Sequence, residues 1–310
     1  MNLRPVVFCL LLACPFVCFA AKRPNVILMM ADDLGYETLG SNGGTPYKTP
    51  NLDKLAANGL RFTNCVSQPV CTPTRVKIMT GRYNFRNYKT FGILDPREKT
   101  FGHVMRDAGY KTCIVGKWQL GRDRKLPGHF GFDEYCLWWL ENKSTRYGNV
   151  GELIQNGKVL PGGKGEYGPD VVSGFMLDFI SRNKEEPFFC YYPMILTHSP
   201  FVPTPDTDKN APKGNNLDLM VDMVAYTDKI VGRVVAHLDK LGLRKNTVIL
   251  YTGDNGTHRG IVGAKVGEHD WPGAKGSNMS EMGMRVPLVV NYPAGGASGR
   301  VLDDPIDFSD

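Results

Sequence analysis

The chain has 310 residues, of which 42% are hydrophobic, and its 37 Lys and Arg residues exceed its 31 Asp and Glu residues, for a net charge of +6. A chain of this length and apolar content can bury one large core, so we expect a folded protein and not a disordered one. The mild positive charge favours anionic ligands, whereas no long basic run or basic patch interleaved with aromatic residues supports a nucleic-acid partner.

Residues 1–21 have the order of parts of a secretory signal peptide. One charge, Arg4, precedes a short apolar run that ends in small residues. Pro15 interrupts this run, which is shorter than the roughly 20 residues that a membrane span needs. We therefore expect export to the periplasm or the medium and no stable membrane span. A weak likeness of residues 11–14 to a bacterial lipid-attachment site leaves lipid anchoring as a minor alternative.

Removal of the signal peptide would leave five cysteines, and an odd number suggests one special thiol. They are Cys65, Cys71, Cys113, Cys136 and Cys190. Cys113 and Cys190 lie in apolar runs, where cysteine behaves as a small core residue, so we expect no dense disulfide framework. The disulfide state of the pair Cys65 and Cys136 stays open.

Short apolar runs along the chain predict buried strands. They are residues 25–30, 111–116, 187–195, 246–252 and 286–292. Helices are predicted between them, at 51–58, 73–80, 100–108, 170–182 and 217–241. This alternation predicts an α/β fold, a three-layer α/β/α sandwich around a large, mostly parallel sheet. The Gly- and Pro-rich segments 142–169 and 202–215 are expected to be loops that form a rim or lid.

The string CTPTR runs from Cys71 to Arg75 and combines a thiol, a proline and a cation. Proline is favoured in the first turn of a helix, so Cys71 is expected at a helix N-terminus, with the helix ending at Gly81. Unpaired backbone N–H groups and the helix dipole favour an anion there, and Arg75 adds a full charge one turn further on. The alternative is a buried cysteine beside a surface arginine.

Polar side chains follow four of the predicted strands directly. They are Asp32 and Asp33, Lys117, His198, and Asp254 and Asn255. Ligands of open α/β sheets bind beyond the carboxyl ends of the strands, so these side chains are expected to form one site. Carboxylate and amide oxygens suit Ca²⁺ or Mg²⁺ and not zinc, with calcium as the first choice. Each residue taken singly could also be an ordinary turn or cap residue.

With these segments in place, the chain resembles the formylglycine-dependent, arylsulfatase-like sulfatases of the alkaline phosphatase-like superfamily, from about residue 24 to 310. The matching strings are NVILMMADDLG, CTPTRVKIMTGRY, GKW, THSPF, TGDNG and GAKGSNMSEMGMRVP, in the family's order. The last string resembles the stretch that supplies a second active-site lysine, here Lys275. The resemblance implies an alkaline phosphatase-like catalytic domain over 22–310. Since relatives continue past Asp310, it also implies a missing C-terminal subdomain.

The resemblance implies a sulfuric ester hydrolase for a sulfated carbohydrate or an aryl or alkyl sulfate. A maturation enzyme would oxidise Cys71 to formylglycine, whose hydrate attacks sulfur, and His198 would protonate the departing alcohol. Ca²⁺, or alternatively Mg²⁺, would be bound by Asp32, Asp33, Asp254, Asn255 and the modified Cys71. The implied catalytic residues are Cys71, Arg75, Lys117, His198 and Lys275. The implied substrate-binding residues are Lys117, His198 and Lys275.

One departure from the family pattern concerns turnover. The family's GKWHLG reads GKWQLG here, so Gln119 replaces a histidine that handles the proton of the second hydroxyl. Glutamine cannot take a proton, although it can orient the hydrate by hydrogen bonding. His258 and His269 are candidates for compensation, with exposed loop histidines as the alternative.

Two further functions fit the same sequence. A phosphonate or phosphodiester hydrolase of the same superfamily would share the CxPxR chemistry. A catalytically impaired binder of sulfated glycans would fit Gln119, with Trp138 and Trp139 as a surface on which a sugar stacks or, alternatively, as core residues.

Overall fold

A computed structural model describes residues 23–141, 146–148, 153–210 and 214–309. The predicted signal peptide lies outside these residues. Among them, no helix is both long enough and apolar enough to cross a bilayer.

The described chain is built around an 11-stranded mixed sheet with the order β13-β3-β12-β9-β1-β8-β4-β5-β6-β7, in which β14 also pairs with β3. Its strands are β1 (Asn25–Ala31), β3 (Leu60–Val66), β4 (Lys111–Lys117), β5 (Glu134–Trp138), β6 (Ile154–Gln155), β7 (Lys158–Val159), β8 (Phe188–Pro193), β9 (Thr247–Gly253), β12 (Arg285–Asn291), β13 (Arg300–Leu302) and β14 (Ile306–Asp307). A second, small sheet has the order β11 (His269–Asp270), β10 (Lys265–Val266) and β2 (Gly44–Thr45).

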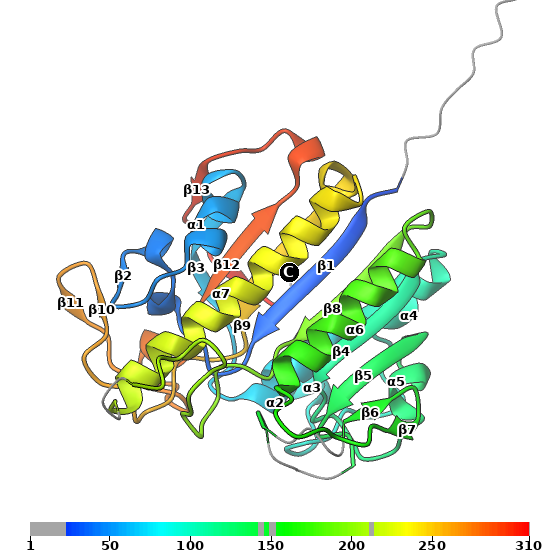
Figure 1. The fold of residues 1–310 in the computed structure, drawn as a ribbon, viewed down its shortest axis with the longest axis horizontal. Helices are drawn as coiled ribbons and strands as arrows, with labels where there is room; N and C mark the ends of the chain where they lie inside the picture. The colour runs from blue at the N-terminus through cyan, green and yellow to red at the C-terminus, as the bar shows by residue number, and fades with distance from the viewer. Residues whose placement is uncertain (1–22, 142–145, 149–152, 211–213, 310) are drawn as a thin grey trace, which may run out of the picture.

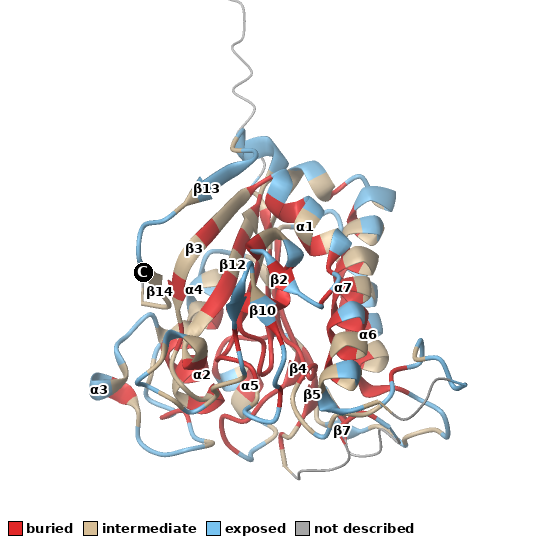
Figure 2. Ribbon diagram, turned by 90° about the vertical axis from the view of Figure 1, so that its left-hand side faces the viewer, coloured by how far each residue is buried: buried red, intermediate tan, exposed pale blue. Residues whose placement is uncertain are grey.

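Helices cover both faces of the large sheet, with α1, α6 and α7 on one face and α2 and α4 on the other (Figures 1 and 2). The α-helices are α1 (Pro50–Ala57), α2 (Cys71–Thr80), α3 (Asn84–Asn87), α4 (Phe101–Asp107), α5 (Leu126–His129), α6 (Gly168–Arg182) and α7 (Asn216–Lys240). The predicted three-layer sandwich is therefore confirmed, and the five predicted strands and five predicted helices all correspond to observed elements.

The core has two parts, one on each face of the sheet, because successive side chains of a strand point to opposite faces. In β1, Ile27 and Met29 belong to the cluster under α6 and α7, whereas Met30 belongs to the cluster that contains Val76 and Met79 of α2. Burial on both faces explains why the central strands read as continuous apolar runs.

Four neighbouring strands at the centre, β9, β1, β8 and β4, are parallel to one another. Their carboxyl ends therefore meet at one edge of the sheet. The neighbouring β12 is antiparallel to β9, so its carboxyl end lies at the opposite edge. The central four strands position the side chains described next.

Candidate active site

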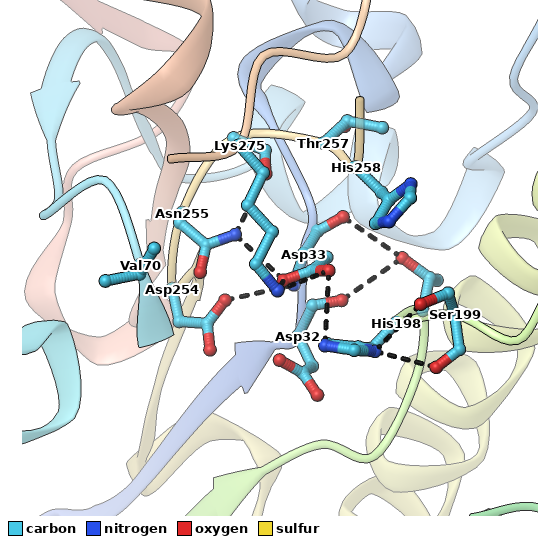
Figure 3. Close-up of polar contacts among 12 residues, drawn as sticks. Asp32, Asp33, Val70, His198, Ser199, Asp254, Asn255, Thr257, His258 and Lys275 are labelled. Carbon is cyan, nitrogen blue, oxygen red and sulfur yellow. Dashed lines mark hydrogen bonds and ion pairs between the residues drawn. The ribbon is translucent and has the colours of Figure 1, made fainter. Parts of the chain in front are cut away.

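Four central strands deliver six polar side chains to the edge where the strands end, and Figure 3 labels all of them except Lys117. They are Asp32 and Asp33 after β1, Lys117 at the end of β4, His198 after β8, and Asp254 and Asn255 after β9. All are fully buried except His198, which is half-buried. The structure therefore brings together the six side chains that the sequence placed at the strand ends.

Hydrogen bonds from a backbone N–H and from an asparagine amide connect the segments that carry the acidic side chains. The Asp33 backbone N–H donates to Oδ1 of Asp254 at 3.0 Å, and Nδ2 of Asn255 donates to Oδ1 of Asp33 at 2.9 Å. The other amide atom, Oδ1 of Asn255, is buried and has no hydrogen-bond partner among the described residues. A buried acceptor without a donor costs free energy, so this oxygen fits a ligand of a cation.

Two groups of three side chains in the described part of the chain could bind a metal ion. Asp32, Cys71 and Asp254 form one, and Asp32, Asp33 and His198 form the other, with ligand atoms within 4.8 Å of one another in each group. Asp32 is common to both groups. Carboxylate oxygens dominate the set, which matches the preference of Ca²⁺ and Mg²⁺ for oxygen.

Cys71 is the first residue of α2 and is 2% exposed. Val70 before it provides no side-chain cap, so the N-terminal N–H groups of the helix face the site without a capping side chain. The helix ends at Gly81, whose φ of 60° suits glycine. One turn after Cys71, Arg75 donates from Nη2 to Oδ2 of Asp254 at 2.8 Å.

Two lysines reach the acidic residues from different segments. Lys117 is fully buried, and its Nζ lies 2.8 and 3.0 Å from the two carboxylate oxygens of Asp32. Lys275 comes from the loop before β12 and donates to Oδ2 of Asp33 at 2.7 Å. Backbone hydrogen bonds from Lys275 to Thr257 and from Gly276 to Pro69 hold this loop against the site.

The three carboxyl groups differ in their affinity for a proton. Burial acts to raise the pKa of Asp32, but Lys117 and the other surrounding cationic groups outweigh burial and hold this pKa well below its usual range. Burial and the charge of Asp32 raise the pKa of Asp33. The same two causes raise the pKa of Asp254 to about 6. Asp32 is therefore the permanently ionised member of the group.

His198 faces Asp33, with 3.6 Å between Nε2 and Oδ2. Its Nδ1 lies 2.7 Å from the carbonyl oxygen of Ser199, and because that oxygen only accepts, Nδ1 carries the proton of the neutral ring. Burial lowers the pKa of His198 to about 4. The ring therefore presents an unprotonated Nε2 to the site at neutral pH.

Three non-glycine residues with positive φ follow three of the strands: Asp33 (57°), Gln119 (55°) and Trp139 (61°). Such conformations are uncommon for these residue types and recur at functional sites. Gln119 is 4% exposed, and its Oε1 has no partner among the described residues. Gln119 thus occupies a strained, buried position beside Lys117.

The structure does not place every suggested residue at the site. His258 is half-buried, is drawn among the site residues in Figure 3 and packs against Phe201 with 5.5 Å between ring centroids. His269, in contrast, is exposed in the small sheet. Trp138 is 1% exposed, so it offers no surface to a sugar ring, and only Trp139 is partly exposed next to Lys117. The suggested stacking surface of two tryptophans is therefore wrong for Trp138.

No sequence motif or pattern predicted Arg146 as a site residue. It lies in the segment predicted as a Gly- and Pro-rich loop, yet it is 7% exposed, and its Nη1 lies 2.6 Å from Oδ2 of Asp32. Its position depends on tertiary contacts. The guanidinium lies 4.3 Å from the Trp138 ring centroid.

Glu37, in the turn η1 (Tyr36–Thr38), is fully buried, and burial raises its pKa to about 7. The folded state therefore binds this proton more tightly than the unfolded state does. The contribution to stability is fully present below about pH 4 and is lost as the pH rises through 7. We expect Glu37→Gln to leave the free energy of unfolding almost unchanged near pH 4 and to raise it above pH 7, by on the order of 3 kcal/mol.

Denaturant unfolding at the two pH values measures this difference, with the exposed Glu185→Gln as control. A gain of equal size at both pH values would contradict the expectation.

Comparisons with known proteins bear on the whole described chain. A family model described as Sulfatase matches residues 24–310. The N-acetylgalactosamine-6-sulfatase of Mus musculus is 30% identical over 319 residues, which cover 91% of this chain and 60% of the mouse protein. The steryl-sulfatase of Rattus norvegicus is 28% identical over 391 residues, which cover 95% of this chain and 67% of the rat protein.

Among solved structures, the crystal structure of Ps i-CgsB superposes with a TM-score of 0.81 at 28% identity, covering 93% of this chain and 70% of that chain. A complex of Ps i-CgsB with k-i-k-neocarrahexaose gives 0.79 at 27% identity, with the same coverage of 93% and 70%. The chain spans about 60% of the length of its mouse relative.

Proposed function

The chain belongs to the sulfatase family, and from that premise we propose that its site hydrolyses a sulfate monoester and releases inorganic sulfate. One observation carries the proposal: Cys71, at the N-terminus of a helix, lies within 4.8 Å of carboxylate oxygens of Asp32 and Asp254. This group has Arg75, Lys117 and Lys275 around it. Such a site combines a modifiable side chain with a cation-binding group and positive charge for an oxyanion.

The residues fit a divalent cation, which we take to be Ca²⁺ with Mg²⁺ as the alternative. The proposed ligands are Asp32, Asp33, Asp254, Asn255 and the modified Cys71. The buried, unpartnered Oδ1 of Asn255 supports this set. When bound, the cation would act as a Lewis acid towards the sulfate ester, and formylglycine made from Cys71 would supply a hydrated aldehyde as the nucleophile.

The chain's own cations would bind and orient the ester. Arg75, Lys117 and Lys275 would neutralise the charge on the sulfate oxygens, which grows in the transition state. Helix α2 adds its N-terminal N–H groups to the same region. Nε2 of His198 is unprotonated in the free site, and the negative charge of a bound sulfate ester would favour its protonation. His198 would then transfer this proton from Nε2 to the departing alcohol, while Nδ1 stays bonded to Ser199.

The proposed substrate is a sulfated carbohydrate or an aryl or alkyl sulfate. The names of the relatives support this range, since one is named an N-acetylgalactosamine-6-sulfatase, another is named a steryl-sulfatase, and a related structure is a complex with k-i-k-neocarrahexaose. We further propose export after removal of residues 1–21 and one catalytic domain over 22–310. The required partner is a maturation enzyme that oxidises Cys71.

The test is sulfate release, measured by ion chromatography, from nitrophenyl sulfate and from sulfated monosaccharides, with the matching phosphate esters in parallel. Mass spectrometry of the CTPTR peptide from the same sample should show a loss of about 18 Da at Cys71. Release of sulfate by a protein whose Cys71 is unmodified would refute the mechanism. Faster hydrolysis of the phosphate esters would favour a phosphonate or phosphodiester hydrolase.

Gln119 favours a second candidate function, an impaired enzyme that binds sulfated glycans, because its side chain cannot accept a proton. We expect Gln119→His to raise kcat about 10-fold or more, since general acid–base groups typically contribute at least that factor, while KM changes little. Steady-state kinetics on nitrophenyl sulfate measure this. An unchanged kcat would show that the proton transfer does not depend on this position.

A further inference from the structure

Arg146 adds one positive charge to the site beyond the cations named above. The charged side chains that contact one another there are the three carboxylates Asp32, Asp33 and Asp254 and four cations. The cations are Arg75, Lys117, Arg146 and Lys275. The formal charge of these described groups is therefore +1, and it would be zero without Arg146.

Hydrogen bonds and a cation–π contact hold the Arg146 side chain in place. Its Nη1 donates to Oδ2 of Asp32 at 2.6 Å and to the carbonyl oxygen of Ile195 at 3.5 Å. The guanidinium stacks over Trp138, which is 1% exposed. An arginine that is 7% exposed in such a setting is fixed next to the carboxylate rather than free to swing into solvent.

The next residue anchors the segment. The Tyr147 hydroxyl donates to the carbonyl oxygen of His198, its ring stacks on Tyr167 with 6.1 Å between centroids, and its carbonyl accepts from Gly168 at 2.8 Å. Tyr147 is 4% exposed. The segment that carries Arg146 is thus connected, through Tyr147, to the backbone of His198.

We infer that Arg146 is a specificity-determining residue that shifts the site from cation binding towards anion binding. Its charge opposes a dication on Asp32 and attracts the sulfate group, and both effects are strong because the site is buried. This inference rests on the proposed function, since it assumes that a divalent cation and a sulfate share the site. Removal of the charge should therefore change the two affinities in opposite directions.

The experiment is isothermal titration of the full chain with CaCl₂ in the absence of sulfate, and with Na₂SO₄ in the presence of saturating Ca²⁺. We expect Arg146→Met to bind Ca²⁺ about 10-fold more tightly than the wild type and sulfate about 10-fold more weakly. Arg146→Gln, which keeps a hydrogen-bond donor for Asp32 but not the charge, should behave in the same way. Arg146→Lys keeps the charge and should keep both affinities within about 3-fold.

The matched control is Arg233→Met, which removes another partly buried arginine, paired with Asp170 between α6 and α7. It should change neither affinity. If Arg146→Met and Arg146→Gln lower the affinities for both Ca²⁺ and sulfate, the residue has only a structural role. If they change neither affinity, its charge is irrelevant. Either result overturns the inference and leaves the proposed function standing. A wild-type chain that binds no Ca²⁺ at all would refute the proposed metal site and the inference with it.

Discussion

Cys71→Ala is expected to lower kcat for sulfate-ester hydrolysis by about 10³-fold or more, with the fold intact. The reason is that the proposed nucleophile comes from this side chain, which lies next to Asp32 and Asp254. The fold should survive because the substitution removes one sulfur atom at the first residue of α2, and alanine is a good helix former. Steady-state kinetics and circular dichroism measure the two parts of this result.

The matched control is Cys136→Ala, which changes a cysteine that is also buried but lies within β5. It should cost stability and leave kcat within a few-fold. Cys71→Ser offers a second readout, because a single hydroxyl can accept the sulfuryl group but has no second hydroxyl to expel it. Intact-protein mass spectrometry should then show a gain of about 80 Da after incubation with substrate. Near-wild-type turnover by Cys71→Ala would refute the assignment.

His198→Asn should lower kcat by about 10² to 10⁴-fold for sulfated sugars, whose alcohol must be protonated as it leaves. For nitrophenyl sulfate the expected loss is less than about 10-fold, since that leaving group departs readily as an anion. The geometry supports this difference, because only Nε2 of His198 faces the site while Nδ1 is bound to Ser199. A plot of log kcat against the pKa of the leaving group measures it.

His237→Asn is the matched control, since His237 lies on α7 and contacts Ser181 away from the site. Its plot should coincide with that of the wild type. An equal loss for good and poor leaving groups in His198→Asn would assign the histidine to binding or folding and not to proton transfer.

The sequence predicted the central fold well because burial on both faces forces apolar runs. The strands that became β1, β4, β8 and β9 lie in the middle of the sheet, and their sequences carry few polar residues. The site followed from the same regularity, since parallel neighbours end at the same edge and the polar residues after them must meet there. Lys275 needed the family resemblance, because it comes from a loop.

Other features were not predictable from local patterns. The strand β3 (Leu60–Val66) has only two buried positions, so its sequence LRFTNCV lacks both an apolar run and clear alternation. In the sequence, Arg146 looks like an ordinary loop residue. Its burial depends on Trp138 and, through Tyr147, on the backbone of His198, and no local sequence pattern connects these residues with Arg146. The structure alone places it beside Asp32.

The pairing of β1 with β9 has a consequence for the order of folding. Asp32 and Asp254 meet only when Ala31 pairs with Gly253, a contact that closes a loop of more than two hundred residues. Loop closure of this length makes the contact slow to form. The proposed cation site should therefore be absent early in folding. If Ca²⁺ binds there, added Ca²⁺ should slow unfolding of the native chain without accelerating the first steps of its folding.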